Sequence, residues 1–272
     1  MNLGLKGRVA LITGSTRGLG RAIAETLAAE NTDIVINGRS SKTVGDVAYK
    51  IEHKFNHNIK AYQCVCDATD PKKIREFFSG KMLQIGRLDI LVNNVGNIET
   101  FGKFEDLSEG DWRRSFELTF MSAARFIRAS LPYLRRSDQA RIINISSLSG
   151  HQPSFTGLNP HYGMAKAGVL NLTKNLANDL GRYGITVNAV CPSTLAGGGW
   201  GNNVADRANR DRITIEEAEL KMRQEENRKS PLDKMGELAD VADLVVFLAS
   251  AKARFLTGHC YNVDGGITRS VK

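Results

Sequence analysis

The sequence predicts an α/β protein built on a doubly wound parallel sheet of the Rossmann type, about seven strands wide, with helices on both faces. Short, almost wholly apolar runs alternate with segments of helical periodicity along the 272 residues, which is the pattern of a parallel sheet buried on both sides. A glycine cluster follows the first apolar run, and no linker, repeat or low-complexity tract divides the chain. We therefore expect a single domain over residues 1–272.

The expected strands are short and rich in apolar residues. The first covers residues 8–13 and ends in the glycine cluster, and comparable runs follow at 34–36, 60–66, 88–92, 141–145, 186–190 and 260–263. Between them, the helical spacing of Ile23 and Leu27 predicts a helix over residues 21–30, and a second helix fits residues 44–55.

Local signals place the starts of two later helices. Asp70 followed by Pro71 supplies an N-cap and a proline at the first helical position, opening a helix to about residue 85. Ser108 and Asp111 have the spacing of a capping box, which begins a helical region that reaches about residue 134. Helices over residues 162–180 and 237–249 complete the alternation.

The segment from 195 to 234 is too long for an ordinary loop between a strand and a helix. It opens with three glycines at 197–199, and the spacing of Thr214 and Glu217 predicts a capped helix to about residue 228. Long segments beyond the carboxyl ends of strands often cover a bound ligand. We expect a substrate lid here, with a surface insertion of no function as the alternative.

Composition excludes several classes of protein. Hydrophobic content of 42% and charged content of 24% are ordinary for a soluble globular protein. No run approaches the roughly 18 apolar residues of a membrane span, and no signal-peptide core precedes the first strand. The net charge of +8 is spread along the chain without a nucleic-acid-binding motif, so it favours an anionic cofactor or substrate. We expect a cytoplasmic protein that binds neither membranes nor nucleic acid.

The four cysteines give little sign of metal or redox chemistry. Cys64, Cys66, Cys191 and Cys260 have no Cys-x-x-Cys spacing, and the one adjacent histidine, His259 before Cys260, does not complete a metal-ligand motif. We expect reduced, buried thiols, and no metal site.

The glycine cluster after the first strand is a candidate phosphate site. Glycines between a strand and a helix allow the backbone to approach a pyrophosphate, which the helix N-terminus stabilises. The spacing here is Gly-x-x-x-Gly-x-Gly rather than Gly-x-Gly-x-x-Gly, and a simple tight turn is the alternative. The predicted cofactor contacts are Gly14, Ser15, Thr16, Arg17, Gly18, Leu19 and Gly20.

The end of the second strand predicts which nucleotide binds. An NAD site usually has an acid there to bond the ribose 2′-hydroxyl, whereas this chain continues with Gly38, Arg39 and Ser40. Arg39, together with Arg17, suits a 2′-phosphate, although either arginine alone is equally an exposed surface residue. We predict NADP(H) rather than NAD(H), with Arg39 and Ser40 among the contacts.

Tyr162 and Lys166 lie four residues apart, so they share one face of the helix predicted there. A free phenol has a pKa of about 10, and poising it near 7 requires roughly 4 kcal/mol in favour of the phenolate. One cation at ~4 Å in an effective dielectric near 20 supplies about that much. The pair therefore predicts a tyrosine that acts as a general acid or base, although this spacing alone is common by chance.

Taken together, these motifs resemble the classical short-chain dehydrogenase/reductase family from residue 7 to residue 266, and within it the 3-oxoacyl-[acyl-carrier-protein] reductase type. The resemblance rests on motifs that occur in the family's order and spacing: the glycine cluster at 13–20, Asp67, Asn93-Asn94-Val95-Gly96, Ile145-Ser146-Ser147, Tyr162 with Lys166, Val187 to Pro192, and Val263-Asp264-Gly265-Gly266.

The resemblance implies an oxidoreductase that interconverts a ketone and a secondary alcohol by hydride transfer, with a 3-oxoacyl thioester as one candidate substrate. Tyr162 is then the proton donor, Ser147 holds the carbonyl oxygen, with Ser146 as the neighbouring candidate, and Lys166 binds the nicotinamide ribose. Cofactor contacts are further implied for Asp67 at the adenine and for Asn93, Val95, Gly96, Tyr162, Lys166, Pro192 and Thr194. The partner is a small carbonyl or alcohol substrate, and the assembly is a homotetramer or homodimer formed through residues 112–134 and 162–180.

Three positions depart from the family pattern. Thr119 stands seven residues after Trp112, where the family often has an asparagine that holds a proton-relay water. Ser193 replaces a glycine, and Gly197 replaces a threonine, for which Thr194 is the possible substitute. His151 lies in the loop before Tyr162 and is expected in the pocket wall or on the surface.

A non-catalytic nucleotide-binding sensor or scaffold is the rival function, although such proteins usually lose the tyrosine or the lysine.

Overall fold

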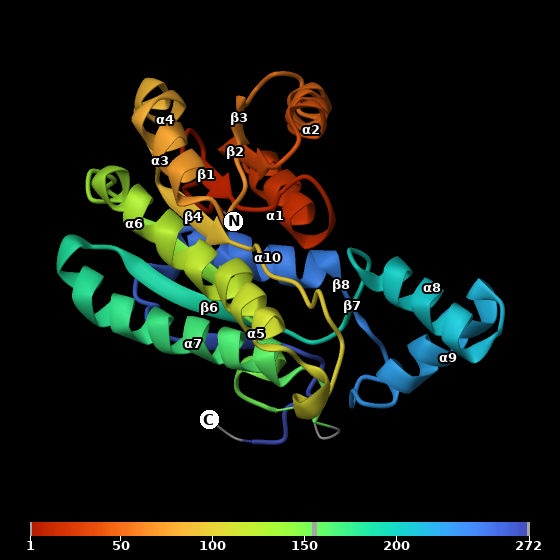
Figure 1. Ribbon diagram of the computed structural model, residues 1–272. Helices are drawn as coiled ribbons and strands as arrows, with labels where there is room; N and C mark the ends of the chain where they lie inside the picture. The colour runs from red at the N-terminus through yellow and green to blue at the C-terminus, as the bar shows by residue number, and fades with distance from the viewer. Residues whose placement is uncertain (1, 154–156, 271–272) are drawn as a thin grey trace.

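A seven-stranded parallel sheet runs through the centre of the protein (Figure 1), and its strand order is β3-β2-β1-β4-β5-β6-β9. The computed structural model describes residues 2–153 and 157–270. The strands are β1 (Val9–Ile12), β2 (Asp33–Gly38), β3 (Ala61–Val65), β4 (Ile90–Asn93), β5 (Arg141–Ile145), β6 (Thr186–Pro192) and β9 (Cys260–Val263). The predicted fold class is therefore confirmed. Strand order reverses between β1 and β4, and a crevice forms at the carboxyl ends of strands at such a point.

Helices cover both faces of the sheet because successive strand residues point to opposite sides. In β1, Ala10 and Ile12 pack into a core shared with Ile23 of α1 and Val245 of α10. Leu11 packs into the opposite core, under the helices of the other face. The helices of the first face are α1 (Gly18–Ala29), α2 (Ser41–Lys54) and α10 (Leu238–Ala249).

The helices of the second face begin at the predicted positions, but two of them are interrupted. The Asp70 carboxylate accepts hydrogen bonds from the amides of Lys72 and Lys73, as an N-cap should. The helix then leaves helical geometry at Gly80 (φ −112°, ψ −91°), so the predicted helix over 70–85 is two helices. The elements of this face are α3 (Pro71–Ser79), α4 (Lys81–Ile85), α5 (Glu109–Phe116), the π-helical turn η2 (Glu117–Met121), α6 (Ser122–Leu134) and α7 (Pro160–Leu180).

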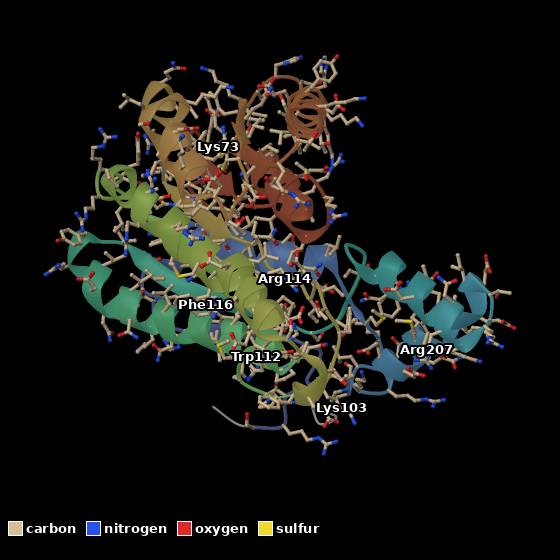
Figure 2. The ribbon with its side chains drawn as sticks, viewed as in Figure 1. Lys73, Lys103, Trp112, Arg114, Phe116 and Arg207 are labelled. Atoms are coloured by element: carbon tan, nitrogen blue, oxygen red, sulfur yellow. The ribbon has the colours of Figure 1, made fainter. Side chains whose placement is uncertain are left out.

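The segment from 195 to 234 forms a pair of helices beside the sheet (Figure 1), with a small core of its own. Its elements are β7 (Leu195–Ala196), α8 (Trp200–Asp211) and α9 (Ile215–Asn227), and β8 (Gly236–Glu237) pairs with β7 to close it. The predicted capping box is present, since Thr214 and Glu217 each bond the other's backbone amide. Helix α8 was not predicted, because the glycines before it suggested only a flexible opening. Arg207 of α8 (Figure 2) forms ion pairs with Asp211 and with Glu225 of α9.

Single-turn helices connect the remaining elements: η1 (Phe104–Asp106), η3 (Leu148–Gly150), η4 (Gly181–Tyr183) and η5 (Ala251–Ala253). In the part of the chain that the structure describes, no helix is both long and apolar enough to cross a membrane.

Candidate active site

A cleft of about 1120 Å³ lies across the carboxyl ends of the central strands and brings together motifs that are far apart in the sequence. The glycine loop, Arg39, Ser147, Tyr162 and the start of the 195–234 segment all line it. Among the predicted site residues, the cleft is lined by Gly14, Thr16, Arg17, Gly18, Leu19, Gly20, Arg39, Asp67, Val95, Gly96, Ser147, Tyr162, Lys166, Pro192 and Thr194.

Three predicted contact residues do not line the cleft, and each side chain has another task. Ser15 donates to the carbonyl of Ile12 at 2.8 Å and accepts from the amide of Asn37. Ser40 caps α2. Asn93 donates to Asn144 Oδ1 at 2.8 Å inside the protein. Their neighbours in the chain do reach the cleft, and a cofactor contact by these three residues stays a prediction.

The glycine loop is built to admit a phosphate group. Gly14 and Gly18 have φ values of +64° and +55°, which favour glycine. A Cβ on Gly20 would lie 2.5 Å from the carbonyl oxygen of Gly14 and 2.6 Å from Asn94 Nδ2. Helix α1 starts here, and its N-cap Arg17 makes no side-chain hydrogen bond to the first turn. The free amides of that turn are therefore available to an anion.

Two guanidinium groups stand at the same end of the cleft. Arg17 and Arg39 both line it and are exposed, and neither forms an ion pair within residues 2–153 and 157–270. No acid follows β2, so nothing there would repel a 2′-phosphate. Farther along, Asp67 Oδ1 accepts from both the amide and the hydroxyl of Thr69, at 2.8 and 2.7 Å, which fixes its carboxylate at the cleft wall. This donor set fits a dinucleotide that carries an additional phosphate.

Tyr162 lies in the first turn of α7 and faces Ser147. Asn159 adopts left-handed geometry (φ 56°) as the N-cap, and Pro160 follows at the start of the helix. The hydroxyl groups of Tyr162 and Ser147 are hydrogen-bonded to each other. Ser146 instead donates to the carbonyl of Lys166 at 3.0 Å. Of the two neighbouring serines, the one that meets the tyrosine is therefore Ser147.

Lys166 is buried under the tyrosine, with only 2% of its surface exposed. Its ammonium donates to the carbonyl of Ile145 at 2.7 Å and lies 5.6 Å from the centre of the Tyr162 ring. Burial lowers the pKa of Lys166 to about 8. Burying the charged lysine here therefore costs free energy, and the hydrogen bond to the Ile145 carbonyl offsets part of that cost.

The pKa of Tyr162 differs from the sequence-based expectation. Burial raises it to about 12, and the hydrogen bond with Ser147 opposes this rise only in part. Lys166 does not lower it towards 7, because its ammonium is directed at Ile145 and is itself partly destabilised. In the cofactor-free protein, Tyr162 thus keeps its proton throughout the neutral range.

Thr119 lies close to Lys166 in the π-helical turn η2. It is 1% exposed, and its Oγ1 has no hydrogen-bond partner among the described residues. A Cβ on Gly96 would lie 2.9 Å from Lys166 Nζ and 3.4 Å from the Thr119 methyl group, so Gly96 separates the two side chains. The hydroxyl is a place for an ordered water, because an unpaired buried hydroxyl is costly.

The sequence did not predict the residues at the open end of the cleft. Trp200, Asn203 and Asp206 of α8 line it, and the Trp200 indole N–H is buried without a described partner. They were missed because the glycine run concealed the start of α8. Ile98, Phe101 and Leu118 also line the cleft, and no sequence signal marked these apolar residues.

Replacing Lys166 with methionine should stabilise the cofactor-free protein. The fall of its pKa from 10.5 to about 8 corresponds to roughly 3 kcal/mol, and loss of the bond to Ile145 returns about 1 kcal/mol. We expect the free energy of unfolding at pH 7 to rise by about 2 kcal/mol. Between pH 8 and pH 10.5 the unfolded wild-type chain binds more protons than the folded one, so the stability of the wild type rises with pH. The difference in free energy of unfolding between Lys166→Met and the wild type therefore shrinks over this range.

Urea unfolding of both proteins at pH 7 and pH 10 measures this change. Lys174→Met is the matched control, since Lys174 lies on the same helix and is exposed, and it should show neither effect. A Lys166→Met variant that is less stable than wild type at pH 7 would contradict the assignment of a costly buried ammonium.

Comparison with known proteins places the chain in a family. A family model described as Enoyl-(Acyl carrier protein) reductase matches residues 14–268. The 3-oxoacyl-[acyl-carrier-protein] reductase FabG of Aquifex aeolicus (strain VF5) is 32% identical over 98% of this chain and 100% of its own length. FabG of Staphylococcus aureus (strain Mu50 / ATCC 700699) is 31% identical over 95% of this chain and 97% of its own.

Solved structures agree with this relationship. The L-sorbose reductase from Gluconobacter frateurii, complexed with NADPH and L-sorbose, superimposes with a TM-score of 0.91 at 27% identity and covers 100% of both chains. The aldohexose dehydrogenase of Thermoplasma acidophilum gives 0.83 at 28% identity, over 99% of this chain and 98% of its own. With a family model matched over most of its length and curated relatives above 30% identity, the chain belongs to the short-chain dehydrogenase/reductase family and is an oxidoreductase that acts on CH–OH groups.

Proposed function

We propose that this protein reduces a ketone to a secondary alcohol with NADPH, and that Tyr162 donates the proton. The observation that carries the proposal is the hydrogen-bonded pair of Tyr162 and Ser147 above a buried Lys166, in a cleft that the glycine loop also lines, together with two arginines that form no ion pair with the described residues. A non-catalytic sensor on this fold has no need to bury an ammonium beneath a tyrosine.

The bound nicotinamide cofactor supplies the hydride, and the chain supplies position and a proton. The glycine-loop amides would hold the pyrophosphate, Arg17 and Arg39 the 2′-phosphate, and Asp67 the adenine. Asp67 and the glycine loop line one continuous cleft with the tyrosine, so a single dinucleotide could reach both. Pro192 and Thr194 also line this cleft and would contact the nicotinamide.

Proton transfer follows from the geometry of the three side chains. The hydroxyls of Ser147 and Tyr162 together hold the carbonyl oxygen of the substrate. The pKa of Tyr162, about 12, keeps the proton on the phenol until negative charge develops on that oxygen. The ammonium of Lys166, 5.6 Å from the centre of the ring, then turns from the carbonyl of Ile145 towards the phenolate and stabilises it, because a charge acts more strongly in a buried site than in water. Alcohol oxidation reverses these steps.

We further propose that the 195–234 segment is the substrate lid. A Cβ on Gly18 would lie 3.0 Å from the Cα of Gly198, so the segment already meets the glycine loop. Gly197 and Gly198 have φ values of +112° and +63°, which allow the backbone there to hinge. Trp200 follows directly and lines the cleft.

The open end of the cleft favours a small polar ketone. Asn203, Asp206 and the unpartnered indole N–H of Trp200 offer hydrogen bonds to substrate hydroxyl groups. The related L-sorbose reductase was solved with a ketose bound. A 3-oxoacyl thioester is the second candidate, because the reductases of that name are 31–32% identical to this chain.

A substrate panel distinguishes the two classes. We expect NADPH oxidation to be fastest with polyhydroxylated ketones, slower with unsubstituted ketones of equal length, and slowest with 3-oxoacyl thioesters. Absorbance of NADPH under matched concentrations gives kcat/KM for each compound. A thioester that exceeds every polyol ketone would assign the enzyme to the acyl class instead.

Tyr162→Phe should remove the proton donor while leaving the cleft intact. We expect kcat to fall by about 100- to 10,000-fold, with NADPH affinity, measured by fluorescence titration, within about twofold of wild type. Tyr183→Phe is the control, since Tyr183 is 40% exposed and outside the cleft, and it should retain full activity. Undiminished turnover by Tyr162→Phe would refute the mechanism.

Arg39→Ala should reduce the preference for NADPH over NADH. Loss of a charge-assisted bond to the 2′-phosphate is expected to weaken NADPH binding by about 10- to 100-fold without changing NADH binding. Arg21→Ala, which removes an arginine paired with Glu25 on α1, should leave the ratio unchanged. If Arg39→Ala leaves the ratio of NADPH to NADH affinity unaltered, another group binds the 2′-phosphate.

We also propose that the protein assembles as a homodimer or homotetramer through α5, α6 and α7, which lie side by side on the outer surface (Figure 1). Phe116, on α5 (Figure 2), and Phe120 stack with ring centres 4.8 Å apart, and a Cβ on Gly168 of α7 would lie 3.0 Å from the Phe120 ring. The helices thus present one continuous surface. Sedimentation equilibrium should show a dimer or tetramer, and a monomer alone would contradict the proposed assembly.

The cytoplasm remains the predicted location of the protein.

A further inference from the structure

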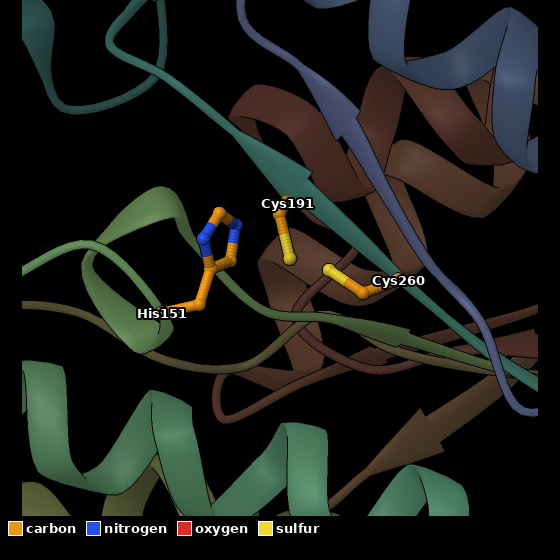
Figure 3. Close-up of side chains that lie close together, drawn as sticks. All are labelled: His151, Cys191 and Cys260. Carbon is orange, nitrogen blue, oxygen red and sulfur yellow. The ribbon is translucent and has the colours of Figure 1, made fainter. Parts of the chain in front are cut away.

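Three potential metal ligands converge on one side of the catalytic turn, outside the cofactor cleft. His151 follows the turn η3, Cys191 lies on β6 and Cys260 on β9, and their ligand atoms all lie within 4.8 Å of one another. Figure 3 shows the imidazole ring turned towards the two sulfur atoms. None of the three side chains lines the cleft, so the cluster is not explained by the hydride-transfer site.

The pairing of β6 with β9 brings the two cysteines together. Strands β6 and β9 pair in parallel, with Ala189 opposite Cys260 and Cys191 opposite Asn262. Paired residues share a face, as do residues two apart in one strand. Cys191, Cys260 and Asn262 therefore point to the same side, where the turn ending at His151 lies above them.

Asn262 adds a fourth donor atom to the cluster. Its Oδ1 lies 2.9 Å from His151 Nε2 and 3.9 Å from Cys260 Sγ. A second contact joins the sulfurs of Cys191 and Cys260. The cluster thus offers one nitrogen, two sulfurs and one oxygen around a common point.

These distances are close to those of a tetrahedral zinc site. Zinc–sulfur and zinc–nitrogen bonds of about 2.3 and 2.0 Å place neighbouring ligand atoms roughly 3.3–3.8 Å apart. Closing the cluster from separations of at most 4.8 Å requires shifts of about 1 Å, within the reach of side-chain rotation. Thiolate and imidazole ligands favour zinc over magnesium or calcium.

A disulfide is a poorer use of the same residues. Cys191 and Cys260 are diagonal neighbours on adjacent strands, which places their Cα atoms roughly 8 Å apart. A disulfide usually needs about 4.4–6.8 Å between Cα atoms. Forming one would pull the strands out of register, whereas a metal ion bridges the longer gap.

We propose that His151, Cys191 and Cys260 bind one Zn²⁺ ion, with Asn262 Oδ1 or a water as the fourth ligand. The thiol protons are released to solvent as the ion binds. The site is structural, because it lies beside the cleft and not in it. Ser147 caps the same turn η3 that ends at His151, so the ion ties the turn carrying that catalytic serine to strands β6 and β9.

Metal binding by the full chain tests this directly. Reduced, metal-free protein is titrated with ZnCl₂ against a chromophoric chelator, and separately with CoCl₂. We expect one Zn²⁺ per chain, and a Co²⁺ spectrum with tetrahedral d–d bands and a thiolate charge-transfer band of two-sulfur intensity. Zn²⁺ should also raise the thermal midpoint by about 5 °C at saturation.

Ligand variants and matched controls assign the site. His151→Ala, Cys191→Ala and Cys260→Ala should each weaken Zn²⁺ binding by about 100-fold or more and abolish the thermal shift. Cys64→Ala and His259→Ala remove a buried cysteine and a histidine outside the cluster, and both should bind as wild type does.

Several results would overturn the proposal. They are a wild-type protein that takes up no zinc, binding that survives in both Cys191→Ala and Cys260→Ala, and binding lost in Cys64→Ala. If an alanine variant fails to fold, the wild-type cobalt spectrum decides, since a spectrum without thiolate charge transfer excludes the site. Because the readout is metal binding, the result is independent of whether the proposed reductase activity is found.

Discussion

The hydrogen bond from the Lys166 ammonium to the carbonyl of Ile145 is the contact around which the Tyr162 part of the cleft is arranged. It places a charge at the end of β5, under the first turn of α7, with 2% of the side chain exposed. A charge in that position is costly, and proteins keep such charges chiefly where they are used. Its neighbours accommodate the lysine: Gly96 has no Cβ where Nζ needs the space, and Ser146 donates a hydrogen bond to the lysine's own carbonyl.

Burial gives the two members of the tyrosine–lysine pair opposite shifts. The pKa of the phenol rises and that of the ammonium falls, because desolvation disfavours the charged form of each. The resting site therefore holds its proton on the tyrosine. Burying these two groups costs free energy, which the packing of the sheet and of α7 offsets. The same packing fixes both side chains before any ligand binds.

Much of the fold follows from the sequence because the strands are buried on both faces and so appear as apolar runs. The predicted bounds of β5 and β9 coincide with those observed. Side-chain direction within a short segment was harder to predict: Asn93 lies inside the protein, whereas Asn94 reaches the cleft and donates to the carbonyl of Gly14. Periodicity gave no guidance there, since β4 ends at Asn93 and Asn94 lies just beyond it.

Features that depend on tertiary contacts could not be read from the chain. The pKa of Tyr162 depends on how deeply α7 is buried and on the direction of the Lys166 side chain. The four-residue spacing of Tyr162 and Lys166 predicts neither of these. The cluster of His151, Cys191 and Cys260 forms only because β6 and β9 become neighbours in the sheet. In sequence these residues showed no metal-ligand spacing.

The two-residue ladder between β7 and β8 has an evolutionary consequence. It pairs Leu195 with Gly236 and Ala196 with Glu237, so the two ends of this segment lie side by side, outside the seven-stranded sheet. Helices α8 and α9 pack on each other around their own small core, and closing such an excursion costs little more entropy when it grows longer. Descendants of one ancestor can therefore exchange or resize this insert as a module while Tyr162 and Lys166 keep their places.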